Sequence, residues 1–117
     1  MYRAGSDETI QFLVGRTLDL VCFASHQIYL HLSEGCRIDV ECVLVYNSKE
    51  GKLNNPEPAA ADRTAVLAAL EQCVESANFL ENSELLLNFG DGSNLTLFPE
   101  SNFESYRIHG NGKSILI

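Results

Sequence analysis

The sequence predicts an α+β fold, with one antiparallel or mixed sheet of about seven or eight strands and two helices on one face of it. Three observations favour this class. A β-hairpin pattern occurs twice, and its second copy starts 57 residues after the first, at position 84 instead of 27. A segment with helical periodicity precedes each copy, and a third hairpin pattern follows the second. We therefore expect one domain, residues 1–117, whose halves are related by a pseudo-twofold axis.

The repeated hairpin is defined by apolar residues at every second position, which is the period of a half-buried strand. Each copy has an acid-glycine pair at its centre, Glu34-Gly35 or Asp91-Gly92, and glycine accepts the positive φ angles of tight hairpin turns. Any two antiparallel hairpins share these features. The evidence for an internal repeat is therefore that a predicted helix precedes both hairpins at the same spacing. The matched apolar pairs are Ile28/Leu85, Leu30/Leu87, Leu32/Phe89, Ile38/Leu95 and Val40/Leu97.

A short amphipathic helix is expected at the start of each half. Residues 7–14 place Ile10, Leu13 and Val14 at the i, i+3, i+4 spacing of a helix with one buried stripe. Residues 59–73 are rich in alanine, which favours helix. The buried stripe of this second helix would contain Val66, Leu67, Leu70 and Val74.

Strand patterns complete both halves. In repeat unit one, about residues 7–46, strands are expected over 17–24, 28–32 and 36–46, the last as one long strand. Residues 47–58 contain turn formers and predict an exposed loop. In repeat unit two, about residues 59–98, strands are expected over 74–80, 84–89 and 93–98, and a C-terminal hairpin over 103–117 follows.

The composition is typical of a globular protein, with 45% apolar and 21% charged residues. No apolar run approaches the roughly 20 residues that span a bilayer, and the N-terminus lacks the pattern of a signal peptide. We therefore expect a cytoplasmic protein. The four cysteines form no Cys-x-x-Cys pair, so neither a disulfide framework nor a zinc site is expected. We expect no cofactor.

The net charge of −8, from 16 acidic and 8 basic residues, limits the possible partners. Nucleic acids and anionic membranes are bound through Lys and Arg, which are few and dispersed here. The simpler interpretation of the acidity is solubility. The sharper interpretation is a partner protein that is basic.

The candidate binding residues are Tyr29, His31, Glu104 and Tyr106. His31 alternates with Leu30 and Leu32, so it would share a strand face with Tyr29, either as a binding surface or as an ordinary solvated face. Glu104 and Tyr106 would share one side of a later strand. A buried Glu104 would need a partner, as a binding carboxylate or as a structural one.

No nucleophile elbow, phosphate loop or His-Glu-x-x-His motif occurs, so we do not expect an enzyme. A string with the form LxLxFxDGxxLxL begins at Leu85, and the string PExxFESY follows at Pro99. This combination resembles a pattern of small uncharacterised bacterial proteins. Some proteins of that general kind are similar to immunity proteins of toxin systems. The resemblance implies no particular site residue.

The function that these observations favour is a non-enzymatic interaction protein that binds a basic protein, as an immunity protein or inhibitor does. The alternative is a module that binds a small molecule or a peptide in a pocket at the junction of the repeats. A homodimer is also expected, because two helices would leave much of a single large sheet uncovered.

Overall fold

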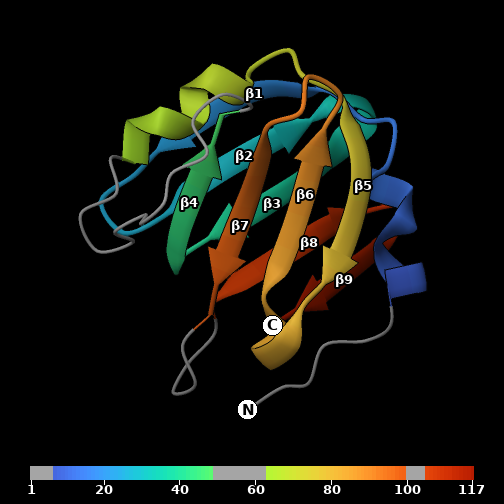
Figure 1. The fold of residues 1–117 in the computed structure, drawn as a ribbon. Coiled ribbons are helices and arrows are strands. Elements are labelled where there is room, and N and C mark those ends of the chain that lie inside the picture. Colours follow the sequence, from blue (N-terminus) through green and yellow to red (C-terminus); the bar gives the residue numbers. More distant parts are fainter. Residues whose placement is uncertain (1–6, 49–62, 100–104) are drawn as a thin grey trace.

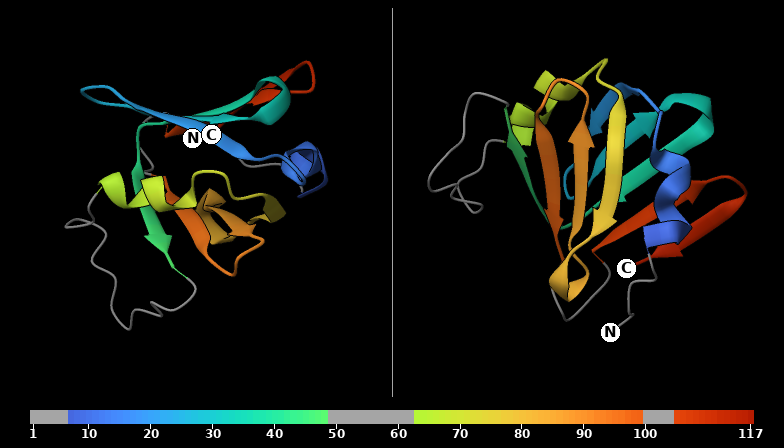
Figure 2. Two further views of the ribbon diagram at one scale, coloured as in Figure 1. Left: turned by 90° about the horizontal axis from the view of Figure 1, so that it is seen from above. Right: turned by 45° about the vertical axis from the view of Figure 1, so that its right-hand side comes forward.

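A computed structural model describes residues 7–48, 63–99 and 105–117, and shows two antiparallel sheets that pack face to face (Figures 1 and 2). The predicted α+β fold with a single sheet is therefore wrong. The five-stranded sheet has the order β1 (Leu18–Phe23), β2 (Ile28–Leu32), β3 (Cys36–Val40), β8 (Tyr106–Gly110) and β9 (Lys113–Leu116). The four-stranded sheet has the order β4 (Val43–Asn47), β7 (Asn94–Phe98), β6 (Leu85–Phe89) and β5 (Val74–Phe79).

The two predicted α-helices are also wrong, because the described residues form 3-10 helices only. These are η1 (Asp7–Leu13), η2 (Ser33–Gly35), η4 (Arg63–Ala69) and η5 (Glu81–Ser83). In η1 and η4 the fully buried residues are three apart, Ile10 with Leu13 and Val66 with Ala69. Three residues per turn place such pairs on one face, so a 3-10 helix suffices to bury them. Figure 2 shows η1 and η4 at opposite sides of the sandwich.

The core lies between the two sheets. Leu30 and Ile38 of the five-stranded sheet and Leu87 and Leu95 of the four-stranded sheet are each at most 1% exposed. In β2, β3 and β6 every second residue is buried in this core, as the sequence pattern predicts. The expected homodimer rested on one large sheet with an uncovered face. The two sheets cover each other's inner faces, so a second copy is not needed to cover them, and the homodimer stays a prediction.

The predicted long strand over residues 36–46 is interrupted at Glu41 and Cys42. β3 ends at Val40 and β4 begins at Val43 in the other sheet. The Glu41 N–H donates to the Ser105 carbonyl at 2.8 Å, just before β8. An alternating apolar pattern continues unchanged when a strand passes from one sheet to another, so the sequence did not reveal this crossing.

The two halves of the chain exchange strands. β4 follows β3 in sequence but pairs with β7, and β8 follows β7 but pairs with β3. The spacing between equivalent elements is 56 residues for β1 and β5 (Leu18 to Val74) and 57 for β2 and β6 (Ile28 to Leu85). The connection after β5 is one residue longer than the connection after β1, which accounts for this difference.

Two predicted features, a loop and a binding residue, lie outside the residues that the structure describes. Most of the predicted loop over residues 47–58, from residue 49 onward, lies outside the described residues, and so does Glu104. Within the described part, none of the helices combines the length and the apolar character that crossing a bilayer requires.

Candidate functional site

Tyr29 and His31 lie on the outer face of β2, because Leu30 and Leu32 between and beside them enter the core. Tyr106 does not join them. Its ring points into the sandwich with 2% exposure, and its hydroxyl donates to the Ser83 carbonyl at 2.8 Å. The structure therefore brings together two of the four candidate residues and separates Tyr106 from their face.

The outer face of the five-stranded sheet carries two rows of side chains that cross all five strands. Directly paired residues on one face of an antiparallel sheet have Cβ atoms about 4.5–5.5 Å apart, so neighbours within each row are in reach of one another. The first row is Leu20, His31, Arg37, His109 and Ser114, and the second is Cys22, Tyr29, Asp39, Arg107 and Leu116.

Asp39 is the centre of the interactions between these rows. The Arg37 guanidinium donates from Nε to Oδ1 at 2.7 Å and from Nη2 to Oδ2 at 3.2 Å. His109 Nε2 lies 3.1 Å from the same Oδ2. Arg37 also lies over the Tyr29 ring, 5.9 Å from its centroid. Charge-assisted, bidentate pairing fixes a carboxylate more firmly than a single neutral hydrogen bond, so the Asp39 side chain, 15% exposed, is held in place.

The other ring nitrogen of His109 contacts a hydroxyl group. Nδ1 lies 3.0 Å from Ser114 Oγ, directly across the β8–β9 pair. In a neutral imidazole one nitrogen donates and the other accepts. A carboxylate accepts only, so the ring proton belongs on Nε2 toward Asp39, and Nδ1 accepts the proton of the Ser114 hydroxyl.

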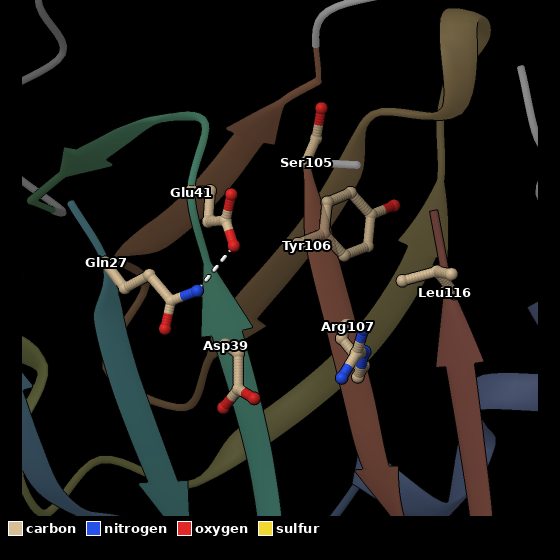
Figure 3. Close-up of a pocket in the computed structure, with 7 residues that line it drawn as sticks. All are labelled: Gln27, Asp39, Glu41, Ser105, Tyr106, Arg107 and Leu116. Carbon is tan, nitrogen blue, oxygen red and sulfur yellow. Dashed lines mark hydrogen bonds between the residues drawn. The ribbon is translucent and has the colours of Figure 1, made fainter. Parts of the chain in front are cut away.

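A small pocket opens at one end of this face, between the ends of β2 and β3 and the strands β8 and β9 (Figure 3). The carboxylates of Asp39 and Glu41 lie on one side of it, and Arg107 and Leu116 lie on the other. Its volume is about 50 Å³, far below the roughly 300–1,000 Å³ of typical ligand pockets. The remaining lining residues are Gln27, Ser105 and Tyr106, and Gln27 Nε2 donates to Glu41.

Burial raises the pKa of the Tyr106 phenol, and the nearby Cys42 raises it further. The phenol therefore stays neutral and serves as a structural hydrogen-bond donor to Ser83. All four cysteines are free thiols. Among the residues that the structure describes, no three His, Cys, Asp or Glu side chains are placed to hold a metal ion.

A second surface feature is an acidic edge, which we define as Glu71, Glu75 and Glu81. These exposed residues precede, occupy and follow β5, the strand at one edge of the four-stranded sheet (Figure 1). None of them takes part in an ion pair within the described part of the chain. Residues 64–106 contain seven acidic residues and no Lys or Arg.

Sequence reasoning missed both features for different reasons. Asp39 and His109 are 70 residues apart in the chain, and only the pairing of β3 with β8 joins them. The acidic edge, by contrast, had a readable signal in the absence of basic residues from 64 to 106, which the total charge conceals.

The chain matches the model of a protein family described as "Family of unknown function (DUF6188)" over residues 9–117, so it belongs to this family. No curated protein and no solved structure matches it.

Proposed function

We propose that this member of a family of unknown function is an interaction protein that holds a basic protein partner along its acidic edge, in the manner of an inhibitor or immunity protein. The observation that carries the proposal is the charge asymmetry of the chain. Residues 64–106 contain seven acidic residues and no Lys or Arg, while the outer face of the five-stranded sheet carries Arg37 and Arg107.

The charge of the acidic edge affects both the rate of association and the choice of partner. Exposed carboxylates produce a negative potential that attracts a basic protein and repels an acidic one. Three such groups along β5 concentrate this potential at one edge of the sandwich. Screening by salt weakens interactions between exposed charges, so the association of the two proteins slows as ionic strength rises.

The alternative function, binding of a small molecule, is supported less well. The pocket beside Asp39 has room for a few water molecules or one small group, which is too little for most metabolites. It also lies on the five-stranded sheet, and of the three predicted pocket residues that the structure describes, Tyr106 lines it while Tyr29 and His31 do not.

The experiment compares two variants with equal changes in charge. The edge variant carries Glu71→Gln, Glu75→Gln and Glu81→Gln. The control variant carries Asp19→Asn, Glu34→Gln and Glu41→Gln, which are also exposed. A partner captured from the native host at low salt is identified by mass, purified, and titrated against wild type and both variants.

We expect the captured partner to be basic and the edge variant to bind it about tenfold more weakly or worse, while the control variant stays within about twofold of wild type. An acidic partner, an affinity that does not change with salt, or equal losses in both variants would each contradict the proposal.

A further inference from the structure

We propose that Ser114 is a nucleophile that accepts small acyl groups from activated esters, with His109 as its general base and Asp39 as the residue that positions His109. This activity belongs to the outer face of the five-stranded sheet and does not depend on the acidic edge. It therefore stands or falls separately from the proposed function.

Ser114, His109 and Asp39 form a chain of polar contacts with the geometry of an activated nucleophile. A nucleophilic serine requires a base within about 2.6–3.2 Å, and the base in turn requires a group that orients it. Ser114 Oγ lies 3.0 Å from His109 Nδ1, and His109 Nε2 lies 3.1 Å from Asp39 Oδ2. His109 is therefore close enough to Ser114 to act as its base and close enough to Asp39 to be oriented by it. Because Asp39 only accepts, Nε2 carries the ring proton and Nδ1 is free to act as the base.

The five-stranded sheet fixes each of these three residues in place. His109 and Ser114 are directly paired across β8 and β9, and His109 is directly paired with Arg37 of β3. Arg37 holds the Asp39 carboxylate through two hydrogen bonds. Side chains on paired strands keep their relative positions without a flexible loop, which favours a preorganised site.

A small pocket begins two residues beyond Ser114 on β9, at Leu116. Leu116 lies two residues after Ser114 on the same face of β9, and it lines the pocket together with Arg107. Arg107 is directly paired with Leu116 and diagonal to Ser114, within reach of an oxygen bound there. A cation at this place stabilises the negative charge that develops on a carbonyl oxygen under attack. The volume of about 50 Å³ limits the acyl group to about the size of acetyl.

The chemical step balances within these groups and an activated ester. Ser114 Oγ forms a bond to the acyl carbon while its proton passes to His109 Nδ1, and Asp39 stabilises the resulting imidazolium. The bond from the acyl carbon to the leaving oxygen then breaks, and that oxygen takes the proton from His109. Water attacks the acyl-serine in the same way and restores the hydroxyl.

The test uses p-nitrophenyl acetate as the acyl donor and the full-length protein. We expect nitrophenolate release and an acetyl group on the peptide that contains Ser114, found by mass spectrometry. Ser114→Ala abolishes this adduct, and His109→Gln slows acylation about 100-fold. Ser25→Ala, at an exposed serine of the β1–β2 turn, leaves the rate unchanged. Circular dichroism verifies that each variant is folded.

The positioning role of Asp39 and the size of the pocket have their own readouts. Asp39→Asn slows acylation, because the imidazolium that forms loses its negative partner, whereas Asp39→Glu, which keeps the carboxylate, retains more of the rate. The p-nitrophenyl ester of octanoate reacts at least tenfold more slowly than the acetate. Acetylation that falls on lysines or on His109 alone, or a Ser114→Ala variant that releases nitrophenolate at the wild-type rate, would overturn the proposal.

Discussion

Gly15 and Glu71 occupy equivalent positions in the two halves, and each donates a backbone hydrogen bond to the first strand of the other half. The Gly15 N–H donates to the Val74 carbonyl at 2.8 Å, and the Glu71 N–H donates to the Leu18 carbonyl at 2.7 Å. Both residues have a positive φ, 90° and 73° respectively. Reciprocal backbone hydrogen bonds therefore join the two halves of the chain. In each half the donor lies two residues after the end of the 3-10 helix.

The substitution Glu71→Gly should stabilise the protein. A non-glycine residue at φ 73° has a conformation that costs about 1 kcal/mol or more, whereas glycine adopts it freely. We expect the free energy of unfolding in urea to rise by about 1 kcal/mol relative to Glu71→Ala. Both variants remove the same charge, so their difference reports on the backbone alone. If Glu71→Ala is as stable as Glu71→Gly, this explanation is wrong.

Gly110→Ala should destabilise the protein more than Gly112→Ala. A Cβ atom on Gly110 would lie 2.7 Å from Cys36 Sγ and 2.9 Å from Phe12 Cε1, whereas a Cβ on Gly112 meets nothing within 4 Å. Both positions have a positive φ, so both variants bear a backbone cost. Overpacking should add about 1–3 kcal/mol to the loss at Gly110. If chemical denaturation gives equal losses of unfolding free energy for the two variants, the side chains around Gly110 move to make room for the added methyl group.

Tyr106→Phe should reduce stability at neutral pH and weaken its dependence on alkaline pH. The substitution removes the hydrogen bond to Ser83, which is worth about 1 kcal/mol. Folding raises the pKa of this phenol above its ordinary value of 10.0, so above that pH the unfolded chain loses a proton that the native state keeps. The stabilising contribution is thus complete below about pH 10 and declines above it, by at most about 1.4 kcal/mol per pH unit.

Urea unfolding of wild type and Tyr106→Phe between pH 8 and pH 11 measures this difference. Tyr29→Phe, which changes a residue on the outer face, is the control. If wild type and Tyr106→Phe lose stability in parallel above pH 10, burial of Tyr106 does not raise the pKa of its phenol.

Ser33→Ala should cost about 1 kcal/mol of stability, because the Thr17 N–H donates to the Ser33 hydroxyl at 3.0 Å. The position equivalent to Ser33 in the second half is Gly90, which has no side chain to accept such a bond. Gly90→Ala serves as the comparison, because its Cβ would meet only the Cys73 carbonyl, at 3.9 Å. An unfolding free energy unchanged by Ser33→Ala would mean that water replaces the hydroxyl without loss.

The amino-acid sequence by itself determined where most of the strands and turns lie, although it did not divide residues 36–46 into β3 and β4. The alternation of Leu30 and His31 set which side chains enter the core, and the Glu34-Gly35 pair set a turn in which both residues have a positive φ. These features are local, because they depend on side-chain period and on backbone conformations that few residues adopt. The sequence spacing also placed equivalent apolar residues in both halves.

Only the tertiary structure decided how the strands divide between two sheets. Val40 and Val43 belong to different sheets although the apolar pattern runs through both, and the pairing of β3 with β8 joins Asp39 to His109 across 70 residues. The short apolar segments near Ile10 and Val66 satisfied a helical period, but burial of two residues per segment required only a 3-10 turn. Long-range pairing and the closure of the core are properties of the whole chain, so local patterns leave them open.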